Sequence, residues 1–341
     1  MKNLIRENIK NLSPYSSARE EYNDNAEVFL DANENPFNNG MNRYPDPYQN
    51  KLKAEISKLK NIAKENIILG NGSDEILDLI FRSYCEPKQD NVIICPPTYG
   101  MYNVLAEINN IEINKVLLNP DFSINTTNII AATNKKTKLI ILCSPNNPTG
   151  NSIDKNDLKY VLDRTNSLVI VDEAYIDFSK KESALSLLLE SPNLIVTQTL
   201  SKAWGMAALR VGMAFASQDI ISILNRVKPP YNLNALSQKE ATSNIKKLSV
   251  YNSQLQMISN NKNSLIKQLN TIPSVSRIYP SDANFLLVKF SDAKHIYNQL
   301  KENGIIVRDR SNQELCGDCL RISVGTDNEN GKLIATLKDL E

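Results

Sequence analysis

Four short segments combine residue types that could do chemistry. The first, GNGSDE (70–75), places two glycines in a turn ahead of Ser73 and Asp74, which stand at the expected start of an amphipathic helix. The free amides and positive dipole end of such a helix start favour phosphate or another anion. The third glycine of a dinucleotide fingerprint is missing and no Gly-Lys-Ser/Thr follows. A plain helix cap would give the same pattern.

Two further segments end apolar runs. CSPNNPTG (143–150) offers the Asn147 amide at a strand end, where ligands of open α/β sheets bind, although such a cluster is often only a turn. LVIVDEAY (168–175) ends its run with Asp172, and Tyr175 follows three residues later. A carboxylate at a buried strand end is costly without a cation. A protonated pyridine nitrogen would be a suitable partner for Asp172.

The fourth segment, TLSKAWGMAALRVG (199–212), carries Ser201, Lys202 and Arg210 among small residues. A lysine in apolar, enclosed surroundings has a lowered pKa and becomes a nucleophilic amine, although either cation alone could be a solvated surface charge. The single histidine, His295, lies in a helical pattern and is expected on a helix surface. It leaves little scope for Ser-His-Asp or Cys-His catalysis and none for a His-rich metal site.

Strand-like runs that alternate with helical patterns must position these segments. Continuous apolar runs at 92–95, 139–143, 168–172, 194–199 and 212–216 predict a parallel sheet covered on both faces. After Pro229 and Pro230 the pattern changes to two polar helical stretches and strands at 284–290, 304–310 and 320–326, typical of a smaller α+β domain. We expect an N-terminal arm and loop (1–39) packing with the small domain, a large domain (40–225) and a small domain (226–341).

Composition limits the possible partners. The chain of 341 residues has 39 Lys plus Arg against 38 Asp plus Glu, which disfavours nucleic acid and anionic membranes. There is no signal-peptide pattern and no apolar run of about 18 residues, so a cytoplasmic location is expected. Of five cysteines, only Cys316 and Cys319 form a CxxC, which is a weak zinc or redox signal against a loop coincidence.

Taken together and in order, SPNNPTG, VDEAY and SKAWGMAALRVG resemble the fold-type I pyridoxal-phosphate aminotransferases, over essentially the whole chain. The resemblance implies an α/β fold with a large, mostly parallel-sheet domain and pyridoxal 5'-phosphate as cofactor. It also implies that Lys202 attaches the cofactor and carries a proton, and that Asp172 pairs with the ring nitrogen. Asn147 and Tyr175 would bond the phenolate oxygen of the ring, and Tyr99 would stack on it. The cofactor phosphate would be bound by Ser73, Asp74, Thr199, Ser201, Arg210 and, across a homodimer, Tyr44.

Further segments, including PYSSAREEY, LDANENP, RYPDP and LRISVGT, are similar to the histidinol-phosphate branch of that family. This implies histidinol phosphate as amino donor and 2-oxoglutarate as acceptor, in histidine biosynthesis. Arg321 would bind the substrate carboxylate, Arg308 a second anion, and Tyr15 and Asn33 would line the pocket. Arg308 could instead be a strand-end surface charge.

Some features leave alternatives open. Trp204 and Ala208 stand where the family commonly has Phe and Gly, which could alter local packing or pocket shape. A phosphothreonine decarboxylase and an aromatic or aspartate aminotransferase would share the cofactor residues. A non-catalytic pyridoxal-phosphate sensor is a further reading, but the chain has no room for an N-terminal winged helix and lacks a basic surface signature.

Overall fold

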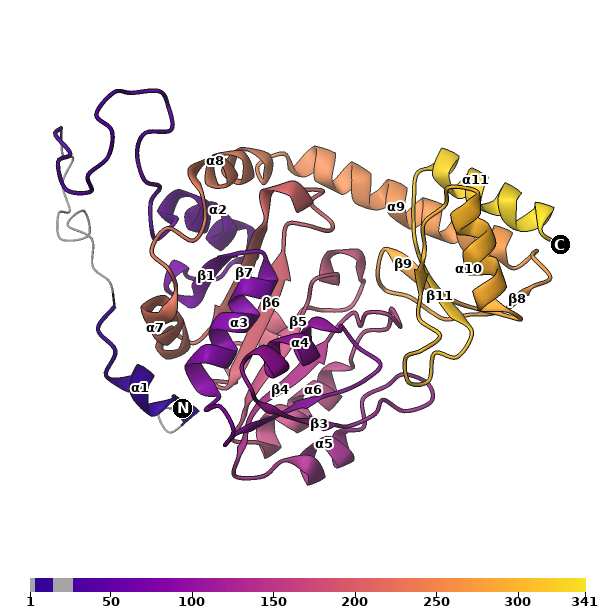
Figure 1. The fold of residues 1–341 in the computed structure, drawn as a ribbon, viewed down its shortest axis with the longest axis horizontal. Helices are drawn as coiled ribbons and strands as arrows, with labels where there is room; N and C mark the ends of the chain where they lie inside the picture. The colour runs from indigo at the N-terminus through magenta and orange to yellow at the C-terminus, as the bar shows by residue number, and fades with distance from the viewer. Residues whose placement is uncertain (1–3, 15–26) are drawn as a thin grey trace.

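The computed structural model describes residues 4–14 and 27–341 (Figure 1). Its larger part is built on a seven-stranded sheet in the order β1-β7-β6-β5-β4-β2-β3. Only β7 runs antiparallel to its neighbours, so the predicted mostly parallel sheet is confirmed. The strands are β1 (Ile67–Asn71), β2 (Asn91–Ile94), β3 (Glu112–Lys115), β4 (Thr137–Cys143), β5 (Leu168–Asp172), β6 (Leu194–Thr199) and β7 (Val211–Ala216).

The central strands are apolar throughout because helices cover both faces of the sheet. Alternate residues of β5 point to opposite sides, so that Val169 and Val171 join one core cluster while Leu168 and Ile170 join the other. Short 3-10 turns, η3 (Lys64–Asn66), η4 (Ile176–Phe178), η5 (Ala184–Leu187) and η6 (Ala207–Leu209), lie between the main elements. One face is covered by α1 (Glu7–Lys10), α3 (Ser73–Tyr84), α4 (Met101–Ile108) and α7 (Gln218–Val227), and the other by α2 (Asn50–Lys60), α5 (Thr126–Ala132), α6 (Lys155–Arg164) and α8 (Ala235–Asn244).

The sequence did not predict two strands of this sheet. In β3, EINK is an edge strand in which no residue is buried, so it lacks the apolar run that marks its neighbours. In β1, IILG is fully buried, but it runs directly into the GNGSDE turn. The helix predicted to start at Ser73 is confirmed, because α3 begins there with Gly72 as its N-cap residue.

A smaller antiparallel sheet has the order β10-β11-β9-β8, with β8 (Val275–Ile278), β9 (Phe285–Phe290), β10 (Arg308–Asp309) and β11 (Cys319–Ser323). Together with α9 (Leu248–Leu269), α10 (Ala293–Glu302) and α11 (Asp327–Asp339), it matches the predicted α+β part. A strand across 304–310 was wrong, because only two residues of that segment pair with β11. Gly304, with φ of 74°, instead belongs to the turn that ends α10.

The two faces of the small sheet have different neighbours. Leu286, Val288 and Leu320 pack with the helices of the small part. From the opposite face, Leu287 and Cys319 belong to the core cluster of the large part. This second face is therefore turned towards the large sheet.

Helix α9 crosses from the large part to the small one (Figure 1). Pro229 and Pro230 lie earlier, between α7 and α8, and α8 packs against α2 of the large part. A second junction is made by backbone: the amide of Asp282 donates to the carbonyl of Gly150 at 2.7 Å. Gly150 has φ of 84°, and a Cβ there would overlap Ser281. The domain bounds near 39 and 225 remain proposals.

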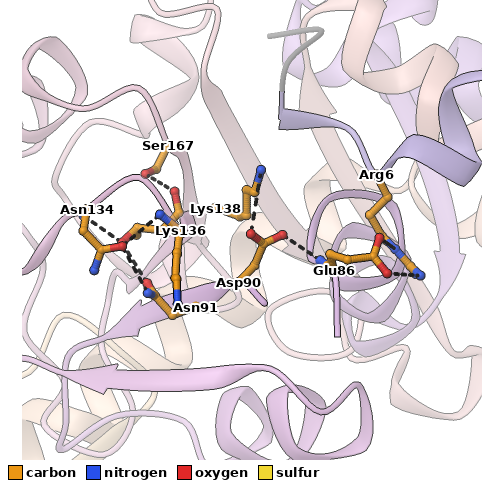
Figure 2. Close-up of polar contacts among 9 residues, drawn as sticks. Arg6, Glu86, Asp90, Asn91, Asn134, Lys136, Lys138 and Ser167 are labelled. Carbon is orange, nitrogen blue, oxygen red and sulfur yellow. Dashed lines mark hydrogen bonds and ion pairs between the residues drawn. The ribbon is translucent and has the colours of Figure 1, made fainter. Parts of the chain in front are cut away.

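A polar network ties the N-terminal segment to one end of the large sheet (Figure 2). Arg6 pairs with Glu86 at 3.1 Å, and the Glu86 amide donates to Asp90, whose carboxylate lies 3.9 Å from Lys138. These groups lie at the amino ends of the parallel strands. The opposite end of the sheet is left for the functional side chains.

His295 is exposed on α10, as predicted. The five cysteines are free; Cys319 is buried at the start of β11, and Cys316 is buried just before that strand. Among residues 4–14 and 27–341, no group of three or more His, Cys, Asp or Glu side chains is arranged to hold a metal ion. Within the same ranges, no helix combines the length and apolar character needed to cross a bilayer.

Candidate active site

A pocket opens at the carboxyl ends of β4, β5 and β6, where the start of α3 and the loop after β6 meet. Ligands of open α/β sheets bind at this end of the strands. Ten of the residues singled out from sequence line it together: Ser73, Asp74, Tyr99, Asn147, Asp172, Tyr175, Thr199, Ser201, Lys202 and Arg210. Gly72, Cys143 and Ala174 complete the lining.

One end of the pocket is a buried carboxylate. Asp172 accepts hydrogen bonds from the Tyr102 hydroxyl at 2.7 Å, the Thr197 hydroxyl at 3.1 Å and the Ala174 amide at 3.2 Å. Burial raises the pKa of this carboxyl, and the donors from Tyr102 and Thr197 oppose that shift. Among the described residues no lysine or arginine forms a salt bridge with Asp172. The carboxylate therefore suits a cationic ring nitrogen.

The opposite end is built for an anion. Helix α3 begins here without a side-chain cap, so its first amides are available. Gly212 allows β7 to approach the start of α3 closely, because a Cβ there would overlap the Ser73 backbone nitrogen, and a Cβ at Gly72 would overlap the Arg210 guanidinium. Thr199 and Ser201 bond to each other at 3.0 Å beside this cup. Amides, hydroxyls and one guanidinium match a phosphate.

Arg210 is held in place by its backbone. Its φ of 55° is left-handed, a conformation that non-glycine residues keep where the surroundings fix it. The Gly72 amide donates to its carbonyl at 2.8 Å. This bond links the Arg210 turn directly to the start of α3.

Lys202 lines the same pocket. Its Nζ is 5.7 Å from the centre of the Tyr175 ring. Burial lowers the pKa of its ammonium group, as do Arg321 and Arg210, whereas Asp74 and Asp172 raise it. A lysine with a lowered pKa in such a pocket can act as nucleophile and base.

The remaining walls orient a ligand. Tyr99 donates to Asp74 at 3.3 Å and meets Tyr102 edge-on at 5.5 Å. Tyr175 is buried and meets Phe285 edge-on at 5.0 Å. From the small sheet, Arg321 donates to the Asn147 side chain at 2.6 Å. An arginine predicted as a carboxylate binder thus reaches the pocket wall.

Other candidates lie elsewhere or cannot be placed. Tyr44 stacks on Tyr231 at 4.4 Å, and it shares with Asn33 a separate hollow beside the start of α8. Tyr15 is outside the described residues. Arg308 is exposed on β10, opposite Arg321. Within one chain, Asn33 and Tyr44 do not enter the main pocket.

The two departures from the family pattern also lie outside the pocket. Trp204 stacks on Tyr251 of α9 at 3.8 Å. Trp204 and Ala208 both line a third hollow, which lies between the loop after β6 and helices α8 and α9. They change the outer packing of the lysine loop, and neither is among the residues that line the pocket.

Two residues that contact Asp172 were not predicted from the sequence. Tyr102 stands three residues after Tyr99 on α4, and Thr197 lies two residues before Thr199, opposite Asp172 in the β5–β6 ladder. The spacing of two residues on a strand could have indicated Thr197, because it places Thr197 and Thr199 on one face. Nothing in the local pattern of α4 signals the contact between Tyr102 and Asp172.

The pocket therefore combines an acid for a ring nitrogen, a nucleophilic lysine and an anion cup, and these fit pyridoxal phosphate. Residues 15–337 match the family model of aminotransferase class I and II, so the chain belongs to this family, whose members are pyridoxal-phosphate-dependent transaminases. Within the family it groups with histidinol-phosphate aminotransferases. That of Flavobacterium psychrophilum is 55% identical over 340 residues, covering 99% of this chain and 98% of the relative, and that of Bacteroides fragilis is 50% identical over 339 residues, covering 99% and 98%.

Solved structures agree at the level of the fold. The histidinol-phosphate aminotransferase from Clostridium acetobutylicum has a TM-score of 0.81 at 23% identity, covering 88% of this chain and 91% of that one. The L-threonine-O-3-phosphate decarboxylase from Porphyromonas gingivalis has a TM-score of 0.71 at 21% identity, covering 88% and 91%. These neighbours share the α/β architecture predicted from the sequence.

Proposed function

We propose that the protein transfers the amino group of L-histidinol phosphate to 2-oxoglutarate, a step of histidine biosynthesis. The observation that carries this proposal is the single pocket in which Asp172, Lys202 and Arg210 converge. Relatives at 50% to 55% identity over nearly the whole chain are named histidinol-phosphate aminotransferase, which supports the amino donor of this proposal. A cytoplasmic location remains part of the proposal.

Pyridoxal phosphate, when bound, supplies a ring that accepts electrons from the substrate carbon next to the amino group. Asp172 would hold a proton at the ring nitrogen, supported by Tyr102 and Thr197. Lys202 would attach the cofactor through Nζ and, once released, move the proton at the substrate carbon. Its lowered pKa favours the neutral amine that this step needs.

The other wall residues would fix orientation. Tyr175 and Asn147 would bond the ring oxygen, and Tyr99 would stack on the ring face. Arg321, already at Asn147, would bind the substrate carboxylate or another anion. The cofactor phosphate would be held by the cup residues Ser73, Asp74, Thr199, Ser201 and Arg210.

A homodimer is also part of the proposal. The segment before α2 exposes apolar side chains, including Val28, Leu30 and Phe37, and leaves Tyr44 half exposed. A second copy would cover this surface and bring Tyr44 of the partner subunit to the phosphate cup. Sedimentation should give a dimer, and a fully active monomer would contradict this part of the proposal.

Changing Lys202 to Ala tests the site directly. Loss of the amine should remove the visible absorbance of the covalently attached cofactor and lower turnover by at least about a thousandfold, because nucleophile and base are lost together. The matched control is Lys262→Ala, which alters a lysine that donates to the Ser281 and Ala283 carbonyls. An unchanged spectrum in Lys202→Ala would refute the site.

The reaction is tested by comparing substrates. The cofactor-loaded protein is given L-histidinol phosphate, aromatic amino acids or O-phosphothreonine, and glutamate and CO₂ are measured. Glutamate formed chiefly from histidinol phosphate supports the proposal. Release of CO₂ from phosphothreonine without glutamate would keep the cofactor residues but replace the reaction.

A further inference from the structure

Three arginine side chains project from one face of the small sheet. Arg308 of β10 lies directly opposite Arg321 of β11, so both side chains leave the same face. Arg310 stands two residues beyond Arg308, and its amide donates to the Cys319 carbonyl at 2.9 Å, which continues the ladder. Its side chain therefore leaves that face too. We call Arg308, Arg310 and Arg321 the arginine face.

This face is turned towards the pocket. Leu287 and Cys319, which share its side of the sheet, pack into the core of the large part, and Arg321 reaches Asn147. Burial lowers the pKa of Arg310, as do Arg321 and Arg308, while Tyr175 of the pocket wall raises it. The three guanidinium groups thus lie within electrostatic range of one another and of the pocket.

The arginine face has unused donors. None of its members forms a salt bridge with a carboxylate in the described parts of the chain. The Nε atoms of Arg310 and Arg321 are buried without a hydrogen-bond partner, and so is the Ser311 hydroxyl. Buried donors without partners are costly, and three neighbouring cations repel one another. A bound anion would offset both costs.

We propose that Arg310 is a specificity-determining residue that completes a site for the doubly charged tail of the substrate, a phosphate ester. The inference rests on the proposed function and deepens it. A carboxylate has one charge and two oxygens, which a single guanidinium fork can match, whereas a phosphate ester has up to two charges and three oxygens. Arg308 and Arg310 supply the additional forks.

The test compares Arg310→Gln with the wild type in the cofactor-loaded enzyme. The measurement is the ratio of kcat/KM for L-histidinol phosphate to that for L-histidinol, which isolates the effect of the phosphate. Loss of one charge-assisted contact should lower this ratio about tenfold to a hundredfold. Arg310→Lys keeps the charge but not the fork, so its ratio should be intermediate. The control is Arg277→Gln, an arginine of β8 that packs over Tyr279 at 4.6 Å.

Each outcome decides the inference. An unchanged ratio in both Arg310 variants would overturn it. A raised KM for 2-oxoglutarate with an unchanged ratio would assign Arg310 to the acceptor carboxylate instead, which also overturns it. If the wild type does not prefer phosphorylated donors, the proposed function fails. Inhibition by inorganic phosphate then tests the anion site by itself. Weaker inhibition in Arg310→Gln than in the wild type supports the site, and equal inhibition refutes it.

Discussion

The charge state of Asp172 depends on its neighbours. Its buried carboxylate must stay ionised to pair with a ring nitrogen, although burial favours the protonated form. The Tyr102 hydroxyl, 0% exposed, is its shortest hydrogen bond at 2.7 Å. Tyr102 also meets Tyr99 edge-on, so one buried side chain supports both the acid and the stacking ring.

Tyr102→Phe should separate these two roles, since it keeps the ring and removes the hydroxyl. We expect a further rise in the pKa of Asp172 and a fall in kcat of about tenfold or more, with little change in KM. The pH dependence of the visible spectrum should shift as well. Tyr84→Phe, which alters another buried tyrosine, is the control. Equal kinetics in both variants would remove Tyr102 from the mechanism.

The sequence was informative where chemistry and strand ends coincide. Asp172 and Lys202 could be predicted because Asp172 ends the buried strand β5 and Lys202 lies three residues after the buried strand β6. Tyr102 could not, because its contact depends on how α4 packs over the sheet. Likewise, the two-residue spacing of Arg308 and Arg310 indicates a shared face with Arg321 only once the strand register is known, because that register places Arg308 opposite Arg321.

At the level of elements, the anion cup depends on how closely β7 approaches the start of α3. Gly212→Ala should push Ser73 away, because the added Cβ would overlap its backbone nitrogen. We expect about 1–3 kcal/mol of destabilisation and weaker cofactor binding, by tenfold or more. Gly100→Ala is the matched control, because Gly100 has helical φ and open space around its Cβ position. Equal cofactor affinity in both variants would contradict this account of the cup.

Element prediction succeeded for the central strands of the large sheet and failed for its two edge strands, β1 and β3. Runs such as LVIVD reflect the need to cover both sides of β5, which sequence alone can indicate. Edge strands such as β3 and β10 form because they pair with a neighbouring strand, not because both of their faces are covered. Their own sequences therefore do not show the apolar run that predicts a central strand.

For the whole molecule, Glu173 couples stability to pH. It is buried beside Asp172 and accepts bonds from Ser183, Ala184 and Gln198. Burial nonetheless raises its pKa to about 7, from 4.5. The folded protein therefore holds a proton that the unfolded chain releases above about pH 4.5. The free energy of unfolding should fall as pH rises from about 4.5 to 7, by at most about 3 kcal/mol.

Glu173→Gln removes this titration. The free energy of unfolding of the wild type minus that of the variant should be more positive at pH 5 than at pH 8. Urea denaturation at the two pH values measures it. Asp177→Asn, which alters a carboxylate paired with Lys60 outside the pocket, serves as the control. A difference independent of pH would show that Glu173 is ionised throughout.

The backbone bond between Gly150 and Asp282 fixes the distance between the two walls of the pocket. One wall is the large sheet, which carries Lys202, and the other is the small sheet, which carries the arginine face. Because main-chain atoms three residues from Asn147 join these walls, a change of pocket side chains can alter substrate affinity without altering the distance between them. The length of a substrate, from its amino-bearing carbon to its charged tail, is thus gauged by the fold itself.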